Sequence, residues 1–125
     1  MWDGFIKTAA VTPKIRVADV SYNAEEVIRL SREAAEEGTK IIVFPELVLT
    51  AYTCGDLFLQ ASLIRKAGRA LLDVAHRTAD LESLIFVGLP IEICGKLYNT
   101  AAVLQRGKIL GFVPKRSLPN YNEYY

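Results

Sequence analysis

The chain has 125 residues, of which 51% are apolar and 23% are charged. This composition is that of one ordinary globular domain and excludes extensive disorder. Fifteen Lys and Arg residues stand against 14 Asp and Glu residues, so nucleic-acid binding would lack its usual electrostatic driving force. No apolar run approaches the roughly 20 residues of a membrane span, and no secretory signal opens the sequence. With two cysteines, a reduced, cytoplasmic chain is expected.

The first part of the chain predicts a strand, a helix and a second strand. Residues 5–12 are mostly apolar and stop before a proline, which is typical of a strand. Asn23 is expected to cap a helix, with Glu26 completing a capping box. Apolar residues then recur at helical spacing until Gly38. The continuous apolar run at 41–44 predicts a strand over 40–44 that is buried on both faces.

The second part predicts one helix and three strands after a loop at 47–56. Helical spacing covers 61–77, and strands are expected at 84–93, 97–105 and 109–113, with short turns between the last three. Strand–helix–strand–helix followed by three strands indicates an α/β fold with a mixed sheet and helices on one face. The other face is expected to lack a partner within this chain.

Two charged residues stand where apolar strands are expected to end. Glu46 follows one strand and Lys115 follows the last, each directly after a proline. A carboxylate at such a rim can act as a general base, and a nearby lysine can stabilise a developing oxyanion. The alternative is that both turn into solvent or form a purely structural ion pair. The spacing alone leaves both interpretations open.

The sequence words around these residues resemble the nitrilase, or carbon–nitrogen hydrolase, superfamily. The words are F-P-E-L at 44–47, L-T-A-Y at 49–52 and V-P-K-R-S-L-P-N-Y-N-E at 113–123. A narrower resemblance, carried by Y-T-C-G-D-L-F at 52–58, is to the glutaminase domain of glutamine-dependent NAD synthetases. One departure is Ala51, where that family usually has glycine.

The resemblance implies a fold and a set of site residues. The fold would be the N-terminal part of a four-layer α-β-β-α sandwich. In a Glu-Lys-Cys triad, Glu46 would be the general base and Lys115 would stabilise the tetrahedral intermediate. Glu123 matches a second glutamate that supports the lysine, and Tyr121 and Tyr52 match positions expected to line the glutamine pocket.

The nucleophilic cysteine of the triad is expected to lie outside this chain. Cys54 and Cys94 both precede Lys115, whereas the family's cysteine follows the lysine word, so both are expected to be small buried or half-buried residues. Together with His76, interpreted as a helical histidine, they are too few to suggest a zinc site. Residues 1–125 are therefore interpreted as an incomplete hydrolase domain, inactive by itself, with any synthetase domain absent.

Three functions follow as hypotheses. In the first, the parent protein hydrolyses glutamine and passes ammonia to ATP- and magnesium-dependent synthesis of NAD from deamido-NAD, in a homo-oligomer. The hydrolase part itself would need no cofactor or metal. In the second, the parent is a free-standing amidase or carbamoylase of the same superfamily. In the third, the chain is a non-catalytic binding or assembly module.

Overall fold

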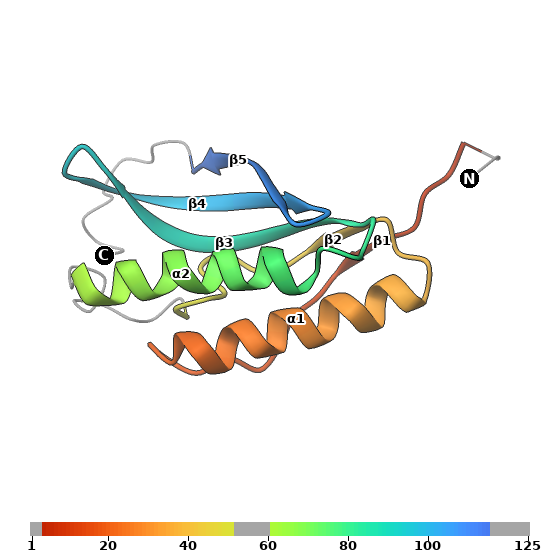
Figure 1. The fold of residues 1–125 in the computed structure, drawn as a ribbon, viewed down its shortest axis with the longest axis horizontal. Coiled ribbons are helices and arrows are strands. Elements are labelled where there is room, and N and C mark those ends of the chain that lie inside the picture. Colours follow the sequence, from red (N-terminus) through yellow and green to blue (C-terminus); the bar gives the residue numbers. More distant parts are fainter. Residues whose placement is uncertain (1–3, 52–60, 116–125) are drawn as a thin grey trace.

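The structure is a computed structural model that describes residues 4–51 and 61–115. It contains one sheet with the strands in the order β1-β2-β3-β4-β5 (Figure 1). The first three strands are parallel, and β4 and β5 continue the sheet as antiparallel hairpins. The strand bounds are β1 (Thr8–Ala10), β2 (Ile41–Val43), β3 (Leu84–Ile93), β4 (Lys96–Gln105) and β5 (Lys108–Pro114). The mixed α/β sheet predicted from the sequence is thereby confirmed.

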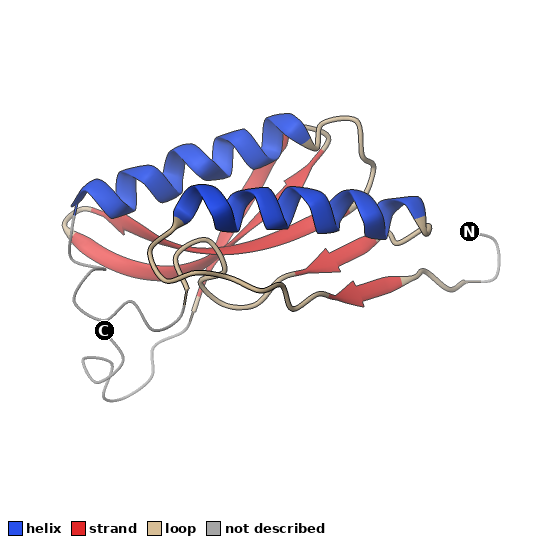
Figure 2. Cartoon of the chain, turned by 90° about the horizontal axis from the view of Figure 1, so that it is seen from below, coloured by secondary structure: helices blue, strands red, loops and turns tan. Residues whose placement is uncertain are grey.

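Both helices, α1 (Val20–Glu36) and α2 (Ala61–Arg77), cover the same face of the sheet. Figure 2, seen from the helical side, shows them in front of the strands. Neither helix is long and apolar enough to cross a membrane, and this holds for the described part of the chain. The core lies between helices and sheet, where each fully buried Val, Leu or Ile side chain contributes about 1.5–3 kcal/mol. It includes Val27, Ile28, Leu71 and Val74 from the helices and Ile42, Ile85, Val87, Leu89 and Leu104 from the strands.

The opposite face of the sheet is open. Ile42 is fully buried under the helices, whereas the next residue, Val43, is 42% exposed on the other face. Val113 on β5 is 57% exposed. The prediction that the strand at 40–44 is buried on both faces is therefore wrong for this chain. Its apolar run reads as a doubly covered strand, but only one covering layer is present in the described residues.

The first helix begins earlier than the capping pattern predicts. Its N-cap is Asp19, whose side chain accepts a hydrogen bond from the Tyr22 amide at 3.2 Å. Asn23 therefore lies inside the first turns and is fully buried. Its side chain binds backbone instead: Oδ1 accepts from the Arg16 amide, and Nδ2 donates to the carbonyl oxygens of Arg16 and Leu49. Asn23 is thus a tie between α1 and the segment that follows Glu46.

Candidate active site

Glu46 and Lys115 are brought together although the two strands that precede them are not neighbours in the sheet. Strands β3 and β4 separate β2 from β5. The segment after β2 crosses toward β3, where the Leu49 amide donates to the Gly88 carbonyl oxygen at 3.2 Å. The Lys115 backbone amide donates to the Asn99 carbonyl oxygen on β4 at 2.8 Å. The segment after β2 therefore approaches β3, while Lys115 continues the pairing of β5 with β4, and the two side chains meet across the intervening strands.

The two side chains form an ion pair. Lys115 Nζ lies 2.8 Å from Glu46 Oε1 and donates to Oε2 at 3.3 Å. Both remain partly accessible, at 37% for the lysine side chain and 43% for the glutamate. The carboxylate therefore contacts a cation and is also accessible from outside. A general base needs such access, because the group that gives up the proton must reach it.

The pair opens on a hollow of about 240 Å³ on the uncovered face of the sheet. Its walls are mainly apolar and come from β2, β3, β4 and β5. They include Val43, Phe44, Pro45, Phe86, Gly88, Ala101, Val113 and Pro114. Two buried polar residues, Asn99 and Thr100, also line it. The Thr100 hydroxyl donates to the Leu89 carbonyl oxygen at 3.0 Å. A small apolar hollow with a few convergent polar groups is the usual form of a small-molecule site.

The backbone next to Glu46 is held in an uncommon conformation. Leu47 has φ +53° and Ala51 has φ +76°, both in the left-handed region that favours glycine. Such conformations persist only where the surrounding structure imposes them, and they gather at functional sites. Here the imposing contacts are the strand β3 below the segment and Asn23 of α1 behind it.

Of the other residues singled out from the sequence, only some lie in the part of the chain that the structure describes. Tyr52, Cys54, Tyr121 and Glu123 lie outside the described residues, so their roles stay predictions. Cys94 is exposed in the turn between β3 and β4, so the expectation of a buried or half-buried thiol is wrong. Its neighbours Ile93, Gly95 and Lys96 are also exposed.

The single histidine lies where the sequence predicts. His76 is exposed in the last turn of α2. Within residues 4–51 and 61–115, no cluster of His, Cys, Asp and Glu residues is suited to hold a metal ion.

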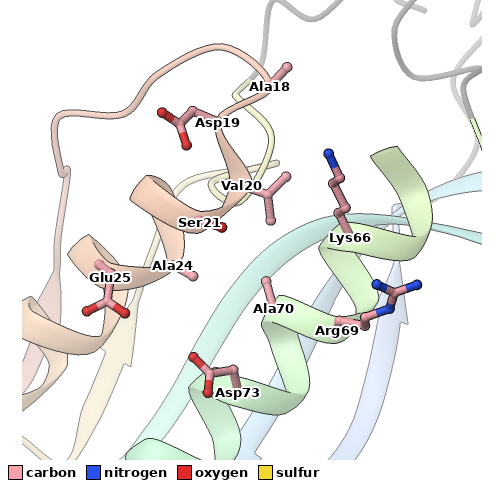
Figure 3. A pocket seen from close by; sticks show the side chains of 10 residues that line it. All are labelled: Ala18, Asp19, Val20, Ser21, Ala24, Glu25, Lys66, Arg69, Ala70 and Asp73. Carbon is pink, nitrogen blue, oxygen red and sulfur yellow. The ribbon is translucent and has the colours of Figure 1, made fainter. Parts of the chain in front are cut away.

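A second hollow, of about 450 Å³, lies between the start of α1 and helix α2. Figure 3 shows Lys66 and Arg69 on α2 and, across the hollow, Asp19 and Glu25 at the start of α1. Glu25 is already paired with Arg77, which ties the two helices together. Charges of both signs line this hollow, so it favours no one class of ligand, and the Glu46–Lys115 hollow remains the candidate site.

The fold and this pair define a class of protein. Residues 7–124 match the carbon-nitrogen hydrolase family, and the chain belongs to that family. It is similar to the glutamine-dependent NAD(+) synthetase of Mycobacterium tuberculosis, with 41% identity over 122 residues, which is 98% of this chain and 18% of that protein. The enzyme of the same name from Aquifex aeolicus is 37% identical over 108 residues, 86% of this chain and 19% of its own length.

Solved structures agree with this assignment. A glutamine-dependent NAD(+) synthetase from Cytophaga hutchinsonii superimposes with a TM-score of 0.87 at 26% identity, covering 96% of this chain and 21% of that one. An amidase from Nesterenkonia sp. superimposes with a TM-score of 0.76 at 21% identity, over 94% of this chain and 45% of that one, which shows the shared fold. The chain thus spans about a fifth of the length of the curated relatives it matches.

Sequence reasoning missed two residues that shape the site. Asn99 lies in the strand predicted at 97–105, where the sequence assigns it no role, and it lines the hollow while only 8% exposed. Gly88 was treated as an ordinary member of its strand. The available signal was its position, because a glycine inside an apolar strand often marks the close approach of another backbone.

Proposed function

We propose that this chain supplies the general base and the oxyanion-stabilising lysine of a glutamine amide hydrolase, as the N-terminal part of a glutamine-dependent NAD synthetase. The observation that carries the proposal is the 2.8 Å contact between Glu46 and Lys115, two residues 69 positions apart that meet at one hollow. The similarity to glutamine-dependent NAD(+) synthetases over 98% of this chain supports the choice of substrate.

Each residue has a defined part in this proposal. Glu46 takes the proton of a cysteine thiol contributed from outside this chain, and the thiolate attacks the side-chain amide of glutamine. Lys115 stabilises the negative charge that develops on the amide oxygen in the tetrahedral intermediate. Glu46 then returns the proton to the amide nitrogen, so that ammonia leaves as the thioester forms, and water releases glutamate from the thioester. Glu123 would support the lysine, and Tyr121 and Tyr52 would line the glutamine pocket.

The rest of the proposal concerns the longer protein. Ammonia would pass to a synthetase domain that binds ATP and magnesium and converts deamido-NAD to NAD. The assembly would be a homo-oligomer in the cytoplasm. The amide hydrolysis itself requires no metal in this scheme, because the base, the cation and the thiol suffice for acyl transfer.

The deciding experiment compares two activities of the full-length protein. Glu46→Gln should lower glutamine-dependent NAD formation at least 100-fold, since removing a general base commonly costs 10²–10⁴-fold. NAD formation from added ammonia should stay within about twofold of the unaltered protein, because that route bypasses the base. Lys115→Ala should behave in the same way.

A matched control separates catalysis from stability. Glu33 on α1 also forms an exposed ion pair, with its carboxylate 2.9 Å from Arg29, and Glu33→Gln should leave both activities intact. Exposed ion pairs contribute about 0–1 kcal/mol, so Glu46→Gln should leave the protein folded. Equal loss of both activities would remove Glu46 from the proposed role. Hydrolysis of other amides without ATP would instead favour a free-standing amidase.

A further inference from the structure

Gly88, in the middle of β3, lies directly beneath the backbone that carries Glu46. A β-carbon built at Gly88 would stand 2.4 Å from the Leu47 amide nitrogen. It would also stand 2.8 Å from the Pro45 carbonyl oxygen and 3.0 Å from the carbonyl carbon of Glu46. All three contacts are with backbone atoms, which cannot rotate away as the end of a flexible side chain can.

Among the glycines of the described residues, only Gly88 has backbone atoms closer than 3.0 Å to a built β-carbon; at Gly107 the close atom is the Ala79 β-carbon, at 2.9 Å. Gly88 has no positive φ that would demand glycine for conformational reasons. Within residues 4–51 and 61–115, no atom lies within 4 Å of a β-carbon built at Gly111 on β5 or at Gly68 in α2. Glycine is therefore required at position 88 because the backbone of residues 45–47 packs against it, and not because of the conformation of the strand.

We propose that Gly88 is a positioning residue for amide hydrolysis, because it lets the backbone of residues 45–47 settle on the sheet and so places the Glu46 carboxylate beside Lys115. This inference rests on the proposed role of Glu46 as the base. The 3.2 Å hydrogen bond from the Leu49 amide to the Gly88 carbonyl oxygen anchors the same segment to the same residue. Gly88 thus determines how closely the segment approaches the sheet and at which point along β3 it is held.

The size of the effect follows from the contact distances. Moving the Leu47 nitrogen from 2.4 Å to ordinary contact, which begins at 3.4 Å, displaces that backbone by about 1 Å. A misplacement of about 1 Å in a reacting group can cost on the order of 100-fold in rate. Glu46 precedes Leu47 directly, so its carboxylate moves with the displaced backbone.

Gly88→Ala in the full-length protein tests the proposal. The turnover number for glutamine hydrolysis should fall about 100-fold, with KM for glutamine changed less than about threefold, and ammonia-dependent NAD formation should be retained. Gly111→Ala is the matched control, because it adds the same methyl group to the same sheet where no atom of the described residues lies within 4 Å; both activities should survive. In a Glu46→Gln background, Gly88→Ala should cause no further loss of residual hydrolysis, since both changes act through one carboxylate.

Each other outcome is decisive. A Gly88→Ala protein that hydrolyses glutamine at the normal rate overturns the proposal. Loss of both activities in Gly88→Ala, with both kept in Gly111→Ala, also overturns it, because Gly88 would then serve the folding of the whole chain. If the Glu46→Gln protein hydrolyses glutamine normally, the proposed role of Glu46 is wrong. That variant therefore distinguishes a failure of the proposed function from a failure of the Gly88 proposal alone.

Discussion

Replacing Asn23 by alanine should destabilise the protein by about 3 kcal/mol, at about 1 kcal/mol for each of its side-chain hydrogen bonds lost. The Asn23 side chain is fully buried. Its Oδ1 accepts from the Arg16 amide at 2.7 Å, and its Nδ2 donates to the carbonyl oxygens of Arg16 and Leu49 at 2.8 and 3.0 Å. Alanine satisfies none of these groups.

Two further variants make the measurement specific. Asn23→Asp has the same shape, but it places a carboxylate oxygen against two carbonyl oxygens and should be at least as destabilising as alanine. Ser31→Ala is the matched control in the same helix: Ser31 is buried too, and its hydroxyl has no hydrogen-bond partner among the described residues. That change should be close to neutral. Urea unfolding of the three variants checks this, and a loss below about 1 kcal/mol for Asn23→Ala would refute the hydrogen-bond argument.

Two other predictions concern backbone strain and acid stability. Ala51→Gly should change stability by less than about 0.5 kcal/mol, because relief of the strain at φ +76° offsets the lost methyl burial and the added chain entropy. Ala67→Gly, in the middle of α2, should cost about 2 kcal/mol in the same urea assay, and equal losses would contradict the strain argument. The hydrogen bond from Arg77 holds the pKa of Glu25 below its usual 4.5. The stability from this pair is therefore present above pH 4.5 and lost as pH falls below it. The difference in thermal unfolding midpoint between the unaltered protein and Arg77→Gln should therefore become smaller as the pH is lowered from about 7 to about 3. A difference that stays constant would show that the ionised Glu25 does not stabilise the protein through Arg77.

Periodicity predicted the helices well where a single face is apolar throughout. The bounds predicted for α2, 61–77, agree with the structure. The start of α1 was wrong by a few residues because Asp19 and Asn23 are equally good capping residues when judged locally. What separates them is a carbonyl group 26 residues further on, at Leu49, which binds Asn23. No local pattern contains that contact.

The candidate site was predictable in part. The strand-end positions of Glu46 and Lys115 follow from where the apolar runs stop, and the structure places the two side chains in contact. Their meeting across two intervening strands was not predictable from spacing, because it depends on the segment that crosses β3 above Gly88. Ala51 shows the same limit: its departure from the usual glycine was visible in the sequence, but its left-handed φ of +76° was not.

The position of the site on the open face has a consequence for its chemistry. At their present exposure of 37% and 43%, Lys115 and Glu46 form a solvent-screened pair, and such exposed pairs contribute about 0–1 kcal/mol net. A cover that excludes water would lower the effective dielectric constant around the pair and so strengthen the attraction between the two charges. Exposed apolar side chains beside the pair, Val43 and Val113, provide a surface on which such a cover can pack. In the proposed hydrolase, a nucleophile carried by that covering layer would arrive together with the exclusion of water, so Glu46, as the proposed base, and Lys115 would act at full strength only in the covered site.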